Sequence, residues 1–228
     1  MAGNGGVPEW RQHLQPCEYL ETDGNCYIQT NILPNQFLET KIKMENFQQV
    51  ENWLVGSRYN NTKQMYAIFC SSELVYLRCD YQSISVNDTR FSILTTLQQL
   101  IVHFNYWDES QKKVSILDFN GNILQSKNLN NIAFNGAKEI PIFAGYAATS
   151  DLRQALQGTR IYNVEFILHD TNDNYNLVSC YVKNGKTFID NKGNVCSAGT
   201  CGMYDIVNQV FYTNDGTGTF SHGGDREI

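Results

Sequence analysis

Apolar and polar residues alternate along much of the chain with a period of two, which is typical of β-strands that bury one face. Residues 40–44 and 158–168 show this alternation most clearly, whereas residues 52–57 are more continuously apolar. The bulky side chains of residues 97–107 predict a strand that crosses the middle of a sheet. Polar or glycine-containing stretches separate these runs at regular spacing, so we predict an all-β protein with about a dozen strands.

Turn-forming pairs separate several of the predicted strands. Asp23-Gly24, between residues 17–22 and 26–30, predicts one hairpin, and Asn120-Gly121 predicts a second. Near the C-terminus, Asn208-Gln209 predicts the turn of a third hairpin. We expect the chain that follows this last turn to pair with the N-terminal strands, which would close the fold and bring the two chain ends together.

One segment, residues 151–157, has a helical pattern. Ser150 can cap its start and Gly158 can end it, but a helix of about two turns must pack on a sheet to be stable. The chain has no internal repeat and no long linker, and each apolar sheet face needs a second surface to cover it. We therefore predict a two-sheet antiparallel jelly-roll sandwich with one short helix.

The N-terminus differs in composition from this region. Glycine and proline surround Trp10 and Leu14, which predicts an arm. Such an arm is either disordered or docks on a partner, with Trp10 and Leu14 as the docking residues. The predicted organisation is an arm over residues 1–16, a sandwich over 17–220 and a C-terminal tail over 221–228.

Charge and hydropathy argue against nucleic acids and membranes as partners. The 228 residues carry a formal net charge of −6, which argues against a nucleic-acid-binding surface because such surfaces are basic. No continuous apolar run is long enough to span a membrane. The N-terminal residues lack the basic start and apolar core of a secretory signal. We expect a protein that is made in the cytoplasm, that stays there or leaves by lysis or assembly, and that inserts into no membrane.

The cysteines and histidines offer no clear chemistry. Seven cysteines without a Cys-x-x-Cys pair predict reduced thiols, although a disulfide between Cys196 and Cys201 would close a small loop and stays open as an alternative. The four histidines show no metal-ligand spacing. Residues 170–174 are rich in oxygen ligands but lack the glycine and glutamate of an EF-hand, which favours a polar turn. We expect neither a metal nor a cofactor.

Catalysis is not expected. Glycoside hydrolases need two carboxylates that face one cleft, and no run of alternating acids occurs in the chain. Glu165 stands alone on its predicted strand, and the adjacent Asp108 and Glu109 point to opposite sides. Binding of glycans without catalysis is favoured instead, unless the aromatic residues concerned belong to the core. The residues that offer aromatic rings or hydrogen-bonding groups for sugars are Arg58, Tyr59, Asn60, Trp107, Asp108 and Tyr146.

Four segments resemble motifs of the concanavalin A-like (LamG-like) jelly-roll family. Residues 202–220 hold Gly-Met-Tyr-Asp-Ile-Val and then Phe-Tyr-Thr-Asn-Asp-Gly-Thr-Gly-Thr-Phe, which is similar to the terminal motif of the family. Residues 19–32 resemble its N-terminal motif, with Asn31 where glycine is usual. Residues 158–166 and 177–181 resemble two of its later strands. Together the resemblance covers almost the whole chain.

The resemblance implies a jelly-roll fold first. Such domains are frequent in tailed-phage virion proteins and in surface proteins of gut bacteria, where they act as adhesive or decorative modules. Our first hypothesis is a non-enzymatic virion-associated accessory protein, a capsid decoration or fibre-type module that contacts virion structural proteins, with cell-surface glycans and further copies of itself as additional partners. The second is a bacterial surface or secreted lectin, and the third is a glycoside hydrolase.

Overall fold

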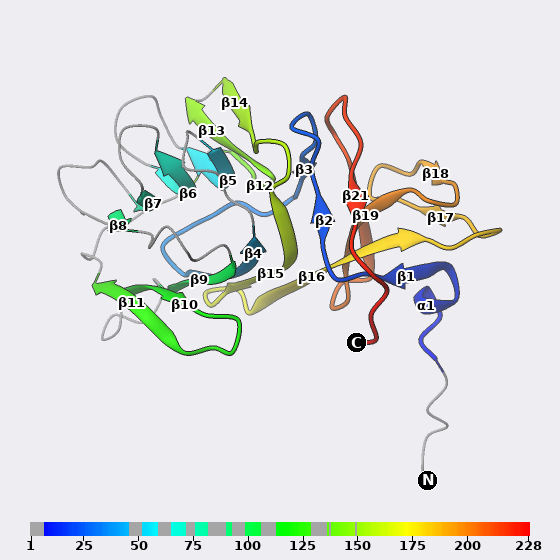
Figure 1. Cartoon of the computed structure of the whole chain (residues 1–228), viewed down its shortest axis with the longest axis horizontal. Helices are drawn as coiled ribbons and strands as arrows, with labels where there is room; N and C mark the ends of the chain where they lie inside the picture. The colour runs from blue at the N-terminus through cyan, green and yellow to red at the C-terminus, as the bar shows by residue number, and fades with distance from the viewer. Residues whose placement is uncertain are drawn as a thin grey trace, which may run out of the picture.

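Two large β-sheets pack face to face and enclose the main core of the protein (Figure 1). The structure is a computed structural model that describes residues 7–45, 52–58, 65–71, 76–81, 90–92, 99–105, 113–128, 136, 138–148 and 150–228. Within these ranges the one helix is α1 (Trp10–His13). The arrangement is all-β and sandwich-like, as the alternation of apolar and polar residues predicts, and it is consistent with a jelly roll.

The larger sheet has eleven described strands, with the main order β11-β10-β9-β4-β15-β16-β19-β20. Their bounds are β1 (Leu14–Pro16), β2 (Leu20–Glu21), β4 (Leu38–Glu45), β9 (Gln99–Asn105), β10 (Lys113–Leu117), β11 (Ile123–Asn128), β15 (Arg160–Leu168), β16 (Asp173–Val182), β19 (Cys201–Asp205), β20 (Val210–Thr213) and β21 (Ser221–His222).

The smaller sheet has eight described strands, with the main order β14-β13-β5-β6-β7-β8. Their bounds are β3 (Ile28–Gln29), β5 (Asn52–Arg58), β6 (Met65–Ser71), β7 (Tyr76–Tyr81), β8 (Arg90–Ser92), β12 (Pro141–Ile142), β13 (Ala144–Ala148) and β14 (Asp151–Gln154). A separate two-stranded hairpin is formed by β17 (Phe188–Ile189) and β18 (Val195–Cys196).

The main core lies between the two sheets. Burial along β4 alternates residue by residue, so that Ile42 and Met44 point inward while Lys41 and Lys43 lie on the outer face. Val55 and Ile142 of the smaller sheet are fully buried against the same core. Burial of each such side chain contributes about 1.5–3 kcal/mol, so this interface supplies most of the driving force for folding.

Several elements agree with the sequence prediction. Residues 97–107 contain β9, which lies between β10 and β4 in the larger sheet. Asn120-Gly121 joins β10 to β11, and Gly121 has a φ of 87°, which glycine adopts without steric strain. Asn208-Gln209 lies in the turn between β19 and β20. These predictions are confirmed, and the signal for each is contained in a short stretch of sequence.

Two local predictions are wrong, because long-range pairing overrides the local signal. Asp23-Gly24 does not turn a hairpin: β2 pairs with β15 and β21 in the larger sheet, whereas β3 pairs with β12 in the smaller one. Residues 151–157 do not form a helix, because β14 completes the edge of the smaller sheet beside β13. One pair, β5 with β13, is parallel rather than antiparallel.

The C-terminal segment closes the sandwich by lying along the N-terminal strands, as predicted. The N–H of Asp215 donates to the carbonyl oxygen of Tyr27, and the N–H of Gln29 donates to the Asp215 carboxylate, both at 2.8 Å. The Asp23 carboxylate accepts from the N–H groups of Asn25 and Thr219, and these hydrogen bonds hold its pKa below the ordinary value. The closure therefore depends on backbone hydrogen bonds to two acidic side chains.

Residues 16–18 and 224–226 lie beside each other at the larger sheet, in agreement with the expectation that the N-terminal and C-terminal segments meet. The N–H of Arg226 donates to the carbonyl oxygen of Pro16 at 3.1 Å, and the N–H of Glu18 donates to that of Gly224 at 2.8 Å. The sheet extends past both predicted domain boundaries, because β1 pairs with β16 and β21 pairs with β2. Part of the predicted arm and part of the predicted tail therefore belong to the sandwich.

The closure gives a prediction for Gly216. A Cβ at this position would overlap the carbonyl oxygen of Asn25, so Gly216→Ala forces the backbone apart. Overpacking of this kind costs about 1–3 kcal/mol, which urea unfolding at equilibrium would measure. Gly224→Ala is the matched control, since its Cβ would meet no heavy atom closer than 3.7 Å. Equal stability of the two variants would contradict the role of this closure.

Candidate functional site

A second group of buried apolar residues lies on the outer face of the larger sheet. Along β16, Leu177 points into the main core, whereas Val178, Cys180 and Val182 point away from it. Alternate residues of a strand face opposite sides, so β16 buries both of its faces. We call this group the outer cluster; its members are Leu14, Val178, Cys180, Val182, Cys196, Tyr204 and Phe211.

The N-terminal segment covers one side of the outer cluster. β1 pairs with β16, with Leu14 opposite Val182, and the Leu14 side chain is completely buried. The indole of Trp10 stacks on the ring of Tyr204, with ring centroids 4.6 Å apart and planes at 28°. The assignment of Leu14 as a docking residue is therefore corrected, because the chain buries Leu14 in itself. Trp10 packs on its own sheet and stays half-buried.

The β17–β18 hairpin covers the other side. The ring of Phe188 meets Tyr204 edge-on, at 5.9 Å and 84°, and meets Phe211 at 5.8 Å and 89°. Such edge-to-face pairs contribute about 0.5–1.5 kcal/mol beyond their area burial. Cys196, in strand β18 of this hairpin, is buried against the outer cluster. The hairpin is thereby fixed opposite α1, across Tyr204.

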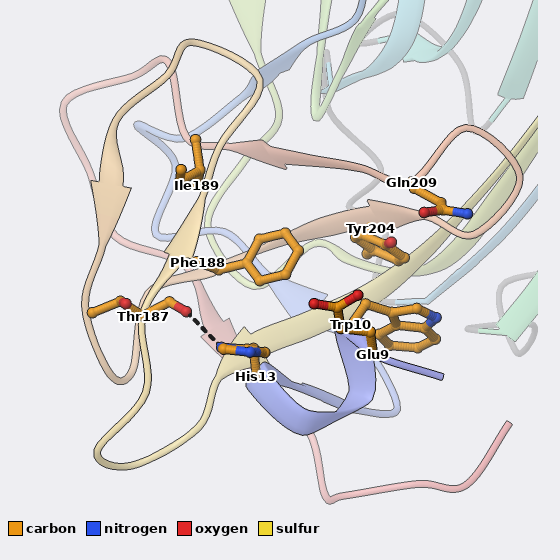
Figure 2. Close-up of a pocket in the computed structure, with 8 residues that line it drawn as sticks. All are labelled: Glu9, Trp10, His13, Thr187, Phe188, Ile189, Tyr204 and Gln209. Atoms are coloured by element: carbon orange, nitrogen blue, oxygen red, sulfur yellow. Dashed lines mark hydrogen bonds between the residues drawn. The ribbon is translucent and has the colours of Figure 1, made fainter. Parts of the chain in front are cut away.

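A groove of about 420 Å³ opens between α1 and β17 (Figure 2). Tyr204 lies between its two walls, and both walls present aromatic side chains. In Figure 2 the Glu9 carboxylate projects over the groove between the ring of Phe188 and the indole of Trp10. The lining residues are Glu9, Trp10, His13, Thr187, Phe188, Ile189, Tyr204 and Gln209.

Polar groups are distributed around this groove. His13 Nδ1 lies 3.0 Å from the carbonyl oxygen of Thr187. A carbonyl oxygen only accepts, so Nδ1 carries the proton of this hydrogen bond, and Nε2 of the neutral ring is an acceptor. Glu9, Thr187 and Gln209 are all solvent-exposed. The groove therefore combines aromatic surface with several accessible hydrogen-bonding groups.

The six residues predicted to contact glycans do not assemble into a described site. Tyr59, Asn60, Trp107 and Asp108 lie outside the described residues. The backbone of Arg58 pairs with Met65 at the end of β5, and its side chain also lies outside the described part. Tyr146 of β13 donates a long hydrogen bond of 3.5 Å to the Gln29 side chain, and it does not line the groove.

The five cysteines whose side chains the structure describes are free thiols: Cys17, Cys26, Cys180, Cys196 and Cys201. Cys196 and Cys201 form no disulfide, which resolves the alternative that the sequence leaves open. Burial raises the pKa of Cys201 to about 11 and that of Cys180 to about 12. Protonated thiols are poor nucleophiles, so these two cysteines are suited to packing rather than to chemistry.

A polar cluster lies elsewhere on the outer face of the larger sheet. The Glu39 carboxylate contacts His103 Nε2 at 2.7 Å and His169 Nε2 at 2.9 Å. These contacts, the one to His103 above all, lower the pKa of Glu39 to about 2. In the part of the chain that the structure describes, no group of three or more His, Cys, Asp or Glu residues is arranged to hold a metal ion. The Glu39 carboxylate is thus held by contacts to two histidine side chains.

Comparisons with known proteins add no assignment. No protein-family model matches the chain, and the search of curated proteins found no match either. Among the described residues, no helix has the length and apolar character needed to cross a membrane.

The Glu39 cluster predicts a pH-dependent stability. Because the pKa of Glu39 falls from 4.5 to about 2 on folding, its stabilisation is complete above pH 4.5 and is lost as the pH falls toward 2. Glu39→Gln should therefore lose about 1 kcal/mol at pH 6, and the difference from the native protein should shrink at pH 3. Urea unfolding at the two pH values measures this, with Glu165→Gln on the same sheet face as the control. A deficit that is independent of pH would contradict a lowered pKa of Glu39 in the folded protein.

Proposed function

We propose that the protein is a non-enzymatic carbohydrate-binding module and that the groove between α1 and β17 is its binding site. The observation that carries the proposal is the combination of Trp10, Tyr204 and Phe188 with exposed polar side chains in one groove. Small-molecule sites are concave, mostly apolar and supplied with a few convergent polar groups. A sugar matches this pattern, because its C–H faces pack on aromatic rings while its hydroxyl groups need hydrogen-bonding partners.

The carboxylates of the groove support binding without catalysis. Glycoside hydrolysis in its common form needs two carboxyl groups, about 5–9.5 Å apart, on either side of the scissile bond. Of the eight lining residues, only Glu9 has a carboxylate. Glu9 is also solvent-exposed, and a single carboxylate cannot serve as both the acid and the nucleophile or base of such a reaction.

The biological setting that we propose is the virion of a tailed phage. The support for it is the resemblance of residues 202–220 to the terminal motif of jelly-roll modules that are frequent in such particles. A bacterial surface lectin would use the same groove, and a secretory signal encoded ahead of this chain would favour that alternative. Mass spectrometry of purified particles tests the virion setting, and consistent absence of the protein from them would exclude it.

Glycan binding is tested by removing the aromatic walls. A glycan array first selects the sugars bound by the native protein, and titration calorimetry then measures the variants. Phe188→Leu keeps apolar bulk but removes the ring, and Trp10→Ala removes the stacking partner of Tyr204. Each should weaken binding about tenfold, the equivalent of about 1.4 kcal/mol.

Phe37→Leu is the matched control, because Phe37 is an exposed aromatic residue outside the groove. Its affinity should equal that of the native protein. Circular dichroism of each variant checks that the sandwich is intact. Unchanged affinity in folded Phe188→Leu and Trp10→Ala would place the sugar site elsewhere, and an array without any signal would reject carbohydrate binding.

A further inference from the structure

The groove has a definite charge character. Glu9 is the one acidic residue among its eight lining residues, and neither lysine nor arginine lines it. The chain as a whole carries a formal net charge of −6, which adds a negative field at long range. The Trp10 ring stacks on Tyr204 and has the Arg11 guanidinium 5.3 Å from its centroid, so Phe188 is the wall ring left to attract a further cation. A carboxylate beside that ring favours a cation, because the face of an aromatic ring also attracts positive charge. An anionic sugar would meet repulsion from Glu9 without a compensating partner among the lining residues.

Gln209 adds a second observation. Its φ is 60°, in the left-handed region that glycine, asparagine and aspartate adopt most readily. Gln209 lies in the turn between β19 and β20, and its N–H donates to the carbonyl oxygen of Asp205 at 2.8 Å. A glycine would satisfy this turn with less strain, yet the chain places a glutamine there with its side chain at the groove. Strained residues cluster at functional sites, which points to a role for the Gln209 amide in binding.

We infer that the groove selects sugars that carry a protonated amino group, that Glu9 pairs with the ammonium, and that Gln209 is a specificity-determining residue that hydrogen-bonds a neighbouring ring substituent. This inference rests on the proposed carbohydrate-binding function. Figure 2 shows Glu9 and Gln209 reaching the groove from different elements, with Tyr204 between their positions. Two polar contacts on either side of an aromatic surface match a ring with several substituents better than a single charged side chain of a peptide.

The test compares three sugars of equal length and different charge. Calorimetry at pH 6 measures binding of the trimers of glucosamine, N-acetylglucosamine and galacturonic acid. The native protein should bind the glucosamine trimer about threefold more tightly than the N-acetylated trimer, a difference typical of one exposed ion pair, and should bind the acidic trimer most weakly. Raising the salt concentration should shrink the preference, because ions screen exposed charges.

Two variants assign the roles. Glu9→Gln should remove the difference between the glucosamine and N-acetylglucosamine trimers while leaving the affinity for the neutral trimer within about twofold. Gln209→Gly should weaken binding of both trimers and raise the urea midpoint of unfolding, because glycine relieves the left-handed strain. A purely structural residue would not lower the affinity when its replacement stabilises the fold. Weaker binding by a more stable variant would therefore assign Gln209 a role in binding.

Three other outcomes would each overturn a specific part of the inference. Equal binding of all three trimers, still sensitive to Phe188→Leu, would overturn the charge preference and leave the carbohydrate site in place. No binding of any trimer, together with no array signal, would overturn both the inference and the proposed function. Binding of Nα-acetyl-lysine amide as tightly as the glucosamine trimer would show capture of a simple cation and would overturn the assignment to amino sugars.

Discussion

The burial of both faces of β16 is the constraint on which the site depends. A strand with one face in the main core and another apolar face outward needs a cover on each side, since its outer cluster would otherwise be exposed. The smaller sheet covers one face, and α1, β1 and the β17–β18 hairpin together cover the other. The two outer covers come from opposite ends of the sequence and do not meet completely. The groove is the space between them.

Closure of the sandwich positions the first of these covers. The segment around Asp215 is bound to Tyr27 and Gln29, and the C-terminal tail is bound to Pro16 and Glu18. These contacts fix the chain where β1 leaves the sheet, so that Leu14 meets β16 and Trp10 reaches Tyr204. The C-terminal motif therefore contributes to the groove in two ways: Tyr204 and Gln209 line it directly, and the segment around Asp215 helps to position the N-terminal wall.

Local sequence was sufficient for the elements that local chemistry determines. Alternation of apolar and polar residues predicts β4, and Asn120-Gly121 predicts the hairpin of β10 and β11. Each signal is contained in a few consecutive residues. The same logic failed at Asp23-Gly24, where the two flanking strands pair in different sheets. The groove could not be predicted in this way, because His13 and Thr187 are 174 positions apart and meet only after β1 has paired with β16. The one available signal is Trp10, an aromatic residue in a glycine- and proline-rich segment, and local sequence cannot tell a disordered or docking arm from a segment that packs on its own sheet.

Trp10 links the stability of the N-terminal segment to the proposed binding. β1, α1 and the side chains of Trp10, His13 and Leu14 attach this segment to the sheet, so its detachment breaks fewer contacts than unfolding of the whole sandwich. Detachment would remove Trp10, Glu9 and His13 from the groove at once, which leaves a ligand nothing to bind on that wall. A ligand that contacts both walls must therefore stabilise the attached form, in proportion to its concentration relative to its dissociation constant. In the proposed site, ligand binding and attachment of the N-terminal segment are therefore thermodynamically coupled.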